Sequence, residues 1–355
     1  MKKRTQIQMI KEVLRDPERK PIPTILRDLV FLWIKHRELP IHYFSRYLFK
    51  KDTANIFDYV PNRLSGRIAP FFNDGRLKHV LDNKLYFYLF YSHFGIATPR
   101  VVAFNHRHLF SINGKTFIIN NYNVFVRFVS DLFSMNEDID CLVLKRIYGS
   151  SSGRNIYLIS EEQLEEGGSS LAEIYNSVVG SEFIFQQRVR QHPDLERLNP
   201  YSLNTMRIDT FIGKDGKVDV ISGFLKMSTN KVPVDNSNTG GCGVGINLTT
   251  GRLRRNGYSK LRVKGVEILT KHPITGVTFE NFKIPYLDEA IDLVKKAALL
   301  MPGLRLLGWD VGFSDEGPVI IEGNSDYGIN SNDLMYGGYF ANEKFREVLG
   351  EFNIQ

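Results

Sequence analysis

The chain has 355 residues, of which 43% are hydrophobic and 24% are charged, with a formal net charge of +7. This ordinary globular composition is enough for two or three lobes around sizeable cores, and it excludes a chain dominated by low-complexity sequence. The modest basic excess suits an anionic ligand such as a nucleotide, or an anionic membrane surface, but it is too diffuse to predict nucleic-acid binding.

Cysteine usage and the N-terminal sequence indicate the compartment. Cys141 and Cys242 form no CxxC pattern, so we expect no disulfide framework and predict a cytoplasmic location. Residues 1–20 lack the apolar core of a secretory signal, and the apolar run at residues 29–34 is far shorter than the roughly 20 residues that span a membrane. We therefore expect a soluble protein, peripheral on the cytoplasmic membrane face at most.

Residues 1–60 are predicted to form short helices separated by prolines. Within them, residues 24–52 (TILRDLVFLWIKHRELPIHYFSRYLFKKD) combine aromatic and basic side chains. One interpretation is a helical pair whose apolar side packs on the body of the protein. The other is an interfacial helix or a docking surface, for the inner membrane or for a biosynthetic complex.

The rest of the chain alternates helical and extended patterns. Helices are predicted at residues 74–94, 169–180 and 288–301. Gly95 and the pair Pro302-Gly303 are placed to end the first and the last of them. Short strands joined by turns are predicted at residues 101–160, 182–250, 304–313 and 318–324. The pattern indicates a mixed α+β fold with mainly antiparallel hairpins in its second half.

Three oxygen-bearing side chains stand out near the C-terminus: Asp310, Glu322 and Asn324. Residues 315–317 (DEG) suit a three-residue hairpin loop with one left-handed residue. In that register Asp310 lies opposite Glu322, within one residue, and Asn324 points to the same face. Facing carboxylates repel each other unless a cation lies between them, and Mg²⁺ prefers oxygen ligands. The hairpin therefore predicts a Mg²⁺ site, with Mn²⁺ as an alternative ion, or else a solvated polar face.

A lysine before a small, flexible loop is the second candidate. Lys145 ends an apolar strand, and residues 149–155 (GSSSGRN), which include Ser150, Ser151 and Ser152, form a turn. Backbone N–H groups in such a loop can fold over phosphates while a lysine beneath binds them. No G-K-[ST] follows, so this is not a Walker loop, and an ordinary hairpin turn is the alternative.

Two cations on strands are the third candidate. Arg207 lies within NTMRIDTF and Lys226 within SGFLKMS, and a glycine-rich loop with Asn236 and Asn238 follows. Buried cations need anions, which phosphates or a substrate carboxylate would supply. The alternative is that both cations pair with Asp or Glu on neighbouring strands.

In combination these features are more specific than any one of them. A lysine before a flexible loop, a later strand with an arginine and a terminal D…E-x-N hairpin, in this order, resemble the ATP-grasp superfamily. The segments SLNTMRI, DNSNTGGCGVGINLTTGRL, HPITG and GWDVGFSDEGPVIIEGN are similar to one branch, the sugar-transfer-associated ATP-grasp family. The resemblance spans roughly residues 75–335, opens on DNK…FGIATP, and does not cover the first 60 residues.

The resemblance implies an ATP-grasp fold, in which two α+β lobes clamp ATP. The expected organisation is an N-terminal helical region (1–70), a core (71–335) and a C-terminal helical tail (336–355). Within the core, we expect a small lobe at about residues 101–188 and a C-terminal lobe at about residues 189–335.

The resemblance also implies roles for single residues. Lys145 would contact the α and β phosphates, beneath a loop that closes over them with Ser150, Ser151 and Ser152. FIFQQRV would hold adenine through Gln186, Gln187 and Val189; many relatives carry Glu near Gln187, and an amide can still bond the adenine edge. Asp194 or Glu196 would reach the ribose. The implied metal ligands are Asp310, Glu322 and Asn324, and the implied catalytic cations are Arg207, near the γ-phosphate and the acyl group, and Lys226.

ATP-grasp enzymes typically activate a carboxylate as an acyl phosphate, which an amine attacks to give an amide. The resemblance thus predicts an ATP- and Mg²⁺-dependent carboxylate–amine ligase acting on small molecules, a sugar acid or an amino acid of surface-polysaccharide biosynthesis, with no nucleic-acid partner. Three alternatives stay open. They are a kinase or other phosphotransferase on a sugar-related substrate, a nucleotide-binding regulator, and a basic module for membrane or nucleic acid.

Overall fold

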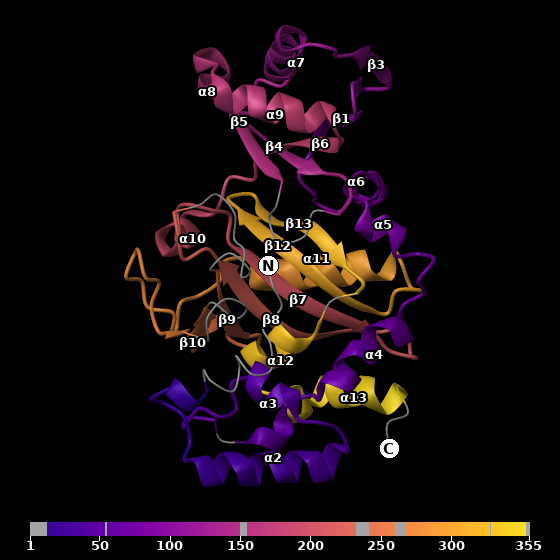
Figure 1. Cartoon of the computed structure of the whole chain (residues 1–355). Helices are drawn as coiled ribbons and strands as arrows, with labels where there is room; N and C mark the ends of the chain where they lie inside the picture. Colours follow the sequence, from indigo (N-terminus) through magenta and orange to yellow (C-terminus); the bar gives the residue numbers. More distant parts are fainter. Residues whose placement is uncertain are drawn as a thin grey trace.

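The structure, a computed structural model, describes residues 13–53, 55–149, 155–231, 241–259, 267–326 and 328–352. Three parts follow one another along the long axis of the molecule (Figure 1). A small lobe (residues 101–187) lies at one end and a large lobe built on a second sheet lies in the middle. At the other end lies a base of helices, contributed by both ends of the chain. The fold is α+β, as the sequence predicts.

The small lobe is a six-stranded antiparallel sheet with helices on one face. Its strands, in the order β3-β2-β1-β6-β4-β5, are Lys115–Ile118, Leu109–Ile112, Val101–His106, Glu182–Gln187, Cys141–Arg146 and Ile156–Ser160. Its helices are α7 (Tyr122–Ser134), α8 (Glu161–Glu166) and α9 (Ser169–Val179). α7 and α9 bury one face of the sheet in a core that includes Leu142, Leu144, Phe183 and Phe185. The opposite face of β4 and β6 is turned toward helix α6 (Lys84–His93), where Ile184 packs on Leu85.

Helix α7 was not predicted, because its sequence is rich in β-branched and aromatic residues. Its apolar side chains nevertheless recur at helical spacing, with Phe125, Phe128, Val129 and Leu132 buried on one side. The Asn121 side chain caps the first turn by accepting a hydrogen bond from the backbone N–H of Val124. Tertiary burial of this stripe outweighs the local propensity.

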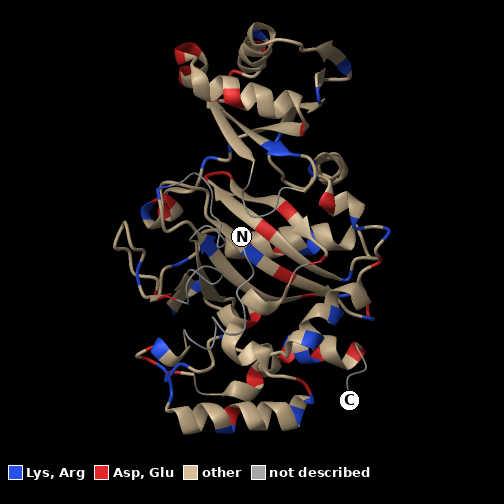
Figure 2. Cartoon of the chain, in the orientation of Figure 1, with Lys and Arg blue, Asp and Glu red and all other residues tan. Residues whose placement is uncertain are grey.

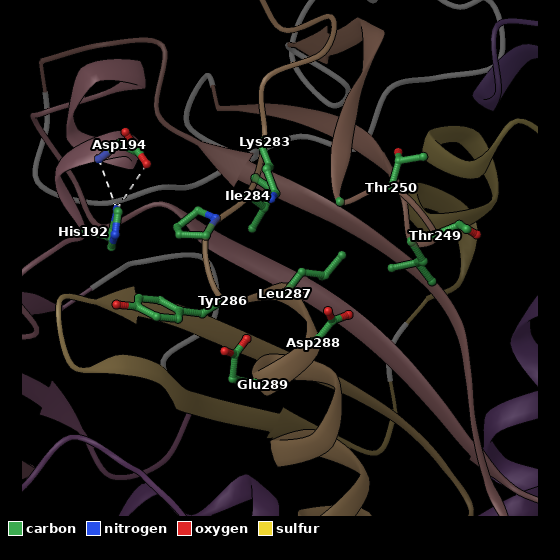
Figure 3. Close-up of a pocket in the computed structure, with 13 residues that line it drawn as sticks. His192, Asp194, Thr249, Thr250, Lys283, Ile284, Tyr286, Leu287, Asp288 and Glu289 are labelled. Atoms are coloured by element: carbon green, nitrogen blue, oxygen red, sulfur yellow. Dashed lines mark hydrogen bonds and ion pairs between the residues drawn. The ribbon is translucent and has the colours of Figure 1, made fainter.

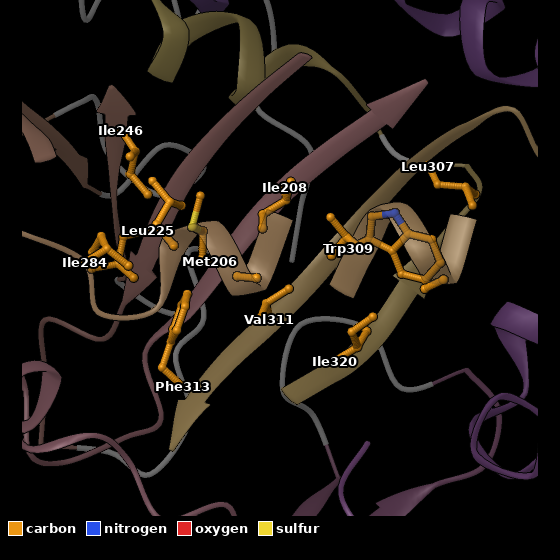
Figure 4. Close-up of a cluster of buried hydrophobic side chains, with 14 of the residues drawn as sticks. Met206, Ile208, Leu225, Ile246, Ile284, Leu307, Trp309, Val311, Phe313 and Ile320 are labelled. Carbon is orange, nitrogen blue, oxygen red and sulfur yellow. The ribbon is translucent and has the colours of Figure 1, made fainter. Parts of the chain in front are cut away.

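The large lobe is a seven-stranded antiparallel sheet in the order β11-β10-β9-β8-β7-β12-β13. These strands are Glu267–Leu269, Arg252–Ser259, Cys242–Asn247, Val218–Met227, Thr205–Ile212, Leu306–Ser314 and Gly317–Asn324. Helix α11 (Leu287–Leu299) covers one face, and the short helix α10 (Pro193–Leu198) lies beside it. Met206, Ile208, Leu225, Trp309 and Val311 fill the core beneath α11 (Figure 4). Alternate residues of the same strands point to the opposite face, where the polar side chains gather.

The hairpin of β12 and β13 pairs Asp310 with Glu322, as predicted, but not for the predicted reason. The loop has two residues, Asp315 and Glu316, since Ser314 already pairs with Gly317. A register shift between Asp310 and Val311 then leaves one extra residue, Ile321, in β13 and restores the expected partner. The bulge brings the two acids face to face.

The base joins the two ends of the chain. It contains α2 (Ile22–His36), α3 (Ile41–Ser45), the 3₁₀ turn η1 (Ile56–Asp58) and α4 (Asn62–Phe72), with α12 (Asn330–Tyr336), η2 (Tyr339–Ala341) and α13 (Glu343–Glu351). Phe72, Tyr339 and Phe345 pack together against Phe211 of β7 and Leu306 of β12. The N-terminal helices and the C-terminal helices therefore share one core beneath the large sheet.

The segment that leads from the base to the small lobe differs from the single helix predicted at residues 74–94. It forms α5 (His79–Asp82) and α6, which are separated at Asn83. The Asn83 side chain accepts a hydrogen bond from the Tyr86 backbone N–H, so it caps α6 and starts a new helix. Gly95 follows with φ of 70°, the left-handed conformation that ends the helical segment.

Candidate functional site

A row of charged side chains crosses four neighbouring strands on the face of the large sheet opposite α11. Arg207 of β7 is directly opposite Asp310 of β12, and Asp310 is opposite Glu322 of β13. Nε of Arg207 donates to Oδ1 of Asp310 at 2.5 Å, and Nζ of Lys226, on β8, donates to Oδ2 at 2.6 Å. Both cations thus pair with one acid of the same sheet, which lies on the neighbouring strand for Arg207 and two strands away for Lys226. For Arg207 this is the alternative left open by the sequence. That acid is itself a predicted metal ligand.

The two cations of this row hold Asp310 ionised. Burial alone would raise the pKa of Asp310, but the charges and hydrogen bonds of Arg207 and Lys226 outweigh it and hold the pKa below its ordinary range. Two cations therefore surround one ionised carboxylate. Asp209 and Glu322 also act on the charge of Arg207. The Arg207 and Lys226 side chains are 13% and 18% exposed, so a phosphate or a carboxylate can reach both cations.

Two residues that the sequence analysis missed hold Arg207 in place. A Cβ at Gly308 would lie 3.0 Å from Nη1 of Arg207 and 3.2 Å from Oδ1 of Asp209, so glycine here leaves room for the guanidinium. Asp209 is fully buried two residues after Arg207, and burial raises its pKa while Arg207 and its hydrogen-bond donors oppose the rise. Its Oδ2 accepts from Tyr339 at 2.6 Å and also from Asn332. The sequence could have indicated Asp209, because it is an acid two residues after Arg207 and therefore points to the same face of the strand.

The donor set on β12 and β13 fits Mg²⁺. Asn324 lies opposite Gly308 and on the same face as Glu322, and its Nδ2 donates to the Gly308 carbonyl at 3.3 Å. Both oxygens of Asp310 accept a hydrogen bond from a cation, but each carboxylate oxygen has a second lone pair. In the described part of the chain, no three His, Cys, Asp or Glu side chains form a metal cluster. Two carboxylates and an amide suit an ion whose remaining ligands are water and phosphate oxygens.

One predicted cation and one predicted amide share a face of the small-lobe sheet. Lys145 pairs with Ile184 across β4 and β6, and Val143 pairs with Gln186, so all four share the face turned toward α6. Gln186 is buried, and its Nε2 donates to the Pro99 carbonyl at 3.4 Å. Lys145 and Gln186, for which nucleotide contacts are predicted, therefore lie on the same face of the sheet.

Other predicted nucleotide contacts are placed differently. The Gln187 side chain points to the opposite sheet face, where it donates a hydrogen bond to Asp138 at 3.4 Å. Only the backbone of Gln187 is therefore left for the predicted contact with adenine. Val189 follows β6 and is half-buried. Ser150, Ser151 and Ser152 lie outside the described residues, as do Asn236 and Asn238.

Lys84, in the segment DNK, is a further candidate for which the sequence predicts no role. It is the first residue of α6, and its backbone N–H donates to the Ile147 carbonyl of the small lobe at 3.1 Å. Its Nζ lies 3.7 Å from Oε2 of Glu322 in the large lobe. Lys84 therefore lies where the small lobe meets the acidic hairpin, and its charge faces the candidate metal ligand.

Asp194 lies apart from the charged row. It is in the first turn of α10, its backbone N–H bonds Nδ1 of His192 at 3.2 Å, and it lines a cavity of about 580 Å³ at the start of α11 (Figure 3). Tyr286, Asp288 and Lys283 line the same cavity. No other predicted site residue does so. Asp194 follows β6 closely in the sequence, but it does not line the same site as Arg207 and Asp310.

Comparison with known proteins gives one family and a set of distant structural likenesses. A family model described as "Sugar-transfer associated ATP-grasp" matches residues 63–346. Among curated proteins, none matches the sequence significantly. Solved structures with a similar chain path include D-cycloserine synthetase DcsG, at 12% identity over 88% of this chain and 94% of that one, with a TM-score of 0.46.

Two further structures extend this comparison. D-alanyl-alanine synthetase A from Vibrio cholerae is 11% identical over 76% of this chain and 65% of its own, with a TM-score of 0.43. N5-carboxyaminoimidazole ribonucleotide synthetase from Thermotoga maritima is 10% identical over 82% of this chain, with a TM-score of 0.39. The chain spans 56% of the length of the Thermotoga maritima protein.

Proposed function

Because this chain belongs to the sugar-transfer-associated ATP-grasp family, we propose that it binds ATP between its two lobes and uses it to join a carboxylate to an amine. The observation that carries this proposal is the pairing of Arg207 and Lys226 with the single carboxylate of Asp310. Both cations keep some exposure on the polar face of the large sheet, where an anion can reach them. A transferring phosphoryl group and a substrate carboxylate are both anions of this kind.

The proposed reaction has two steps. An oxygen of the substrate carboxylate attacks the γ-phosphorus of ATP, the bond from that phosphorus to the bridging oxygen breaks, and ADP leaves with the electron pair. The amine nitrogen then attacks the acyl carbon, phosphate leaves, and the amine releases a proton to solvent. Phosphoryl transfer needs chiefly positioning and charge stabilisation, which Arg207 and Lys226 can supply without a nucleophilic serine or cysteine.

The other residues have supporting roles in this proposal. Lys145, on the interlobe face of β4, and Lys84, at the start of α6, would hold phosphates from the small-lobe side. Asp310, Glu322 and Asn324 would hold Mg²⁺, or Mn²⁺ in its place, and a bound divalent ion would neutralise charge on the phosphate oxygens. Gln186, which lies on the same sheet face as Lys145, would contact the base.

For the substrate we propose a sugar acid or an amino acid of surface-polysaccharide biosynthesis. The family name associates its members with sugar transfer, and amidation of a uronic acid is the concrete form of the proposal. The site itself adds only that the substrate is anionic, since the charge near Arg207 and Lys226 selects for a negative group.

The test is a screen for ADP release with amino acids and uronic acids as carboxylates, followed by mass spectrometry of the products. With hydroxylamine in place of the amine, an acyl phosphate gives a hydroxamate of the correct carboxylate. A kinase that phosphorylates a hydroxyl gives a stable phosphorylated sugar and no hydroxamate. ADP release that needs no amine, together with that stable product, would replace the ligase by a phosphotransferase on the same fold.

A further inference from the structure

Helix α2 presents an apolar face to solvent. Of its 15 residues, Ile25, Asp28 and Leu32 are buried against the rest of the base. On the opposite side Leu26, Val30, Trp33 and Ile34 follow the i, i+4, i+7 and i+8 spacing of one helical stripe. Each of these four is between 50% and 58% exposed, and Phe31, at 48%, borders them. The helix is thus apolar on the side that packs and on the side that does not.

This outer face carries no negative charge. The only acid of α2, Asp28, is buried and accepts hydrogen bonds from Nζ of Lys20 at 3.1 Å and from the Tyr43 hydroxyl at 3.2 Å. Exposed Arg27 and Lys35 flank the apolar stripe instead. Leu39, which is 71% exposed, continues the apolar surface beyond the helix.

The described residues around α2 carry a basic excess. Residues 13–53 contain 9 Lys and Arg against 5 Asp and Glu, a net charge of +4 within a chain whose formal net charge is +7. An apolar stripe flanked by positive charge matches a membrane surface, where an apolar acyl layer lies beneath anionic lipid headgroups.

The position of α2 suits a flat surface. It lies lengthwise across the end of the molecule farthest from the small lobe, and its ribbon is largely uncharged (Figures 1 and 2). No helix in the described ranges is long and apolar enough to cross a bilayer. A contact through α2 would leave the small lobe at the end of the molecule farthest from that surface (Figure 1).

We propose that the outer face of α2, defined by Leu26, Val30, Phe31, Trp33 and Ile34, inserts into the interfacial layer of an anionic phospholipid membrane. The apolar side chains enter the acyl boundary, while Arg27, Lys35 and the neighbouring basic residues meet the lipid phosphates. A second copy of this chain is the less favoured occupant. An α2–α2 contact would bring two regions of net charge +4 (residues 13–53) together, and like charges oppose such an approach.

Trp33 provides a native reporter for this contact. The chain has two tryptophans, and Trp309 is fully buried, with its Nε1 donating to Thr210 at 2.8 Å. We expect the Trp33 emission to shift to the blue and to be shielded from an aqueous quencher when vesicles of phosphatidylcholine with about 30% phosphatidylglycerol are added to the full chain. The variant Trp33→Phe should bind the same vesicles without the shift.

Matched triple variants test which surface binds. Leu26→Ser, Val30→Ser and Ile34→Ser together should weaken vesicle flotation about tenfold or more, since they remove the inserted apolar area. The control combines Ile118→Ser, Met135→Ser and Leu299→Ser, three comparably exposed apolar residues outside the base, and should bind as the wild type does. Binding should also fall when salt is raised from about 0.1 M to about 0.5 M, or when phosphatidylcholine alone is used.

The proposal is overturned if the full chain ignores anionic vesicles, or if the two triple variants bind them equally. Equal binding to neutral and anionic vesicles would show that lipid charge does not contribute. That result would rule out an anionic membrane as the specific partner. Sedimentation equilibrium without lipid decides the second-copy alternative: a dimer that the α2 variant dissociates, with no vesicle binding, means that the face is a self-association surface. ATP turnover is independent of vesicle binding, so failure here leaves the ligase proposal intact.

Discussion

Two buried ion clusters lie in the same protein, and they differ in the number of cations that bind the acid and in access to solvent. In the base, Nε of Arg46 lies 3.2 Å from Oδ2 of Asp333, with side chains 1% and 0% exposed. The remaining guanidinium nitrogens donate to Asn62 at 3.0 Å, to the Val60 carbonyl at 3.3 Å and to Asn330 at 2.5 Å. One cation meets one anion, and neutral oxygens satisfy the rest.

The cluster on the large sheet is different. Asp310 is almost as buried, but two cations surround it and both keep some exposure. Burial by itself therefore does not separate a structural ion pair from a ligand site. The cluster of Arg46 and Asp333 is sealed from solvent, whereas Arg207 and Lys226 remain within reach of a ligand.

The largest effect is expected in the sealed cluster. Arg46→Ala should lower the free energy of unfolding by about 3–5 kcal/mol, because Asp333 is left as an uncompensated buried charge between α3 and α12. Urea unfolding measures this loss. The control Arg76→Ala removes an exposed ion pair with Asp74 and should leave the unfolding midpoint unchanged. An Arg46 variant as stable as this control would show that the cluster does not hold the base together.

The half-open cluster should respond in rate more than in stability. Arg207→Ala should reduce turnover about 10²- to 10³-fold, equivalent to about 2.7–4 kcal/mol of transition-state stabilisation, and should change ATP affinity less. Lys226 still pairs with Asp310 in this variant, so the stability loss should stay below that of Arg46→Ala. Arg207→Lys keeps the charge and should retain part of the activity. Equal losses of ATP affinity and turnover would place Arg207 in ground-state binding instead.

The pH dependence of the half-open cluster gives a smaller effect. The folded pKa of Asp310 lies below its ordinary value of about 3.9. Between the two values the unfolded chain binds more protons than the folded one, so this stability is present above about pH 4 and is lost as pH falls through the lower pKa. The stability difference between wild type and Asp310→Asn should thus be constant near neutral pH. Below about pH 4 it should shrink by up to about 1.4 kcal/mol per pH unit in urea titrations.

A difference that persists unchanged at acid pH would mean that the ionised carboxylate is not what Arg207 and Lys226 stabilise.

The smallest effect on the free protein is expected at the rim. Glu322 is 34% exposed and lies 3.7 Å from Nζ of Lys84, so Glu322→Gln should change the unfolding free energy by less than about 1 kcal/mol. The same variant should lose most of the rise in melting temperature that Mg-ATP gives the wild type, since bound ligand stabilises only through its site. A full thermal gain in Glu322→Gln would remove Glu322 from the metal set.

Much of the candidate site follows from local patterns in the sequence. The α11 stripe, the helix at residues 169–180 and the pairing of Asp310 with Glu322 depend on periods of 3.6 and 2 within short segments, and the structure confirms them. The turn prediction was wrong by one residue, and a bulge restored the register. Helix α7 and the break at Asn83 were missed because burial on a tertiary surface, and a single cap, decided them.

The sequence by itself determined which chemical groups are available: two strand cations, two acids and an amide on a hairpin, and an aromatic, basic N-terminal segment. Only the tertiary structure decided that Arg207 and Lys226 share Asp310, because that contact depends on the strand order β8-β7-β12-β13. It joins residues about a hundred positions apart. Exposure of the outer face of α2 was equally undetermined, since an apolar helix can be buried on every side. Contacts across a sheet and the surface that a helix leaves uncovered are long-range outcomes of packing, which local periodicity does not encode.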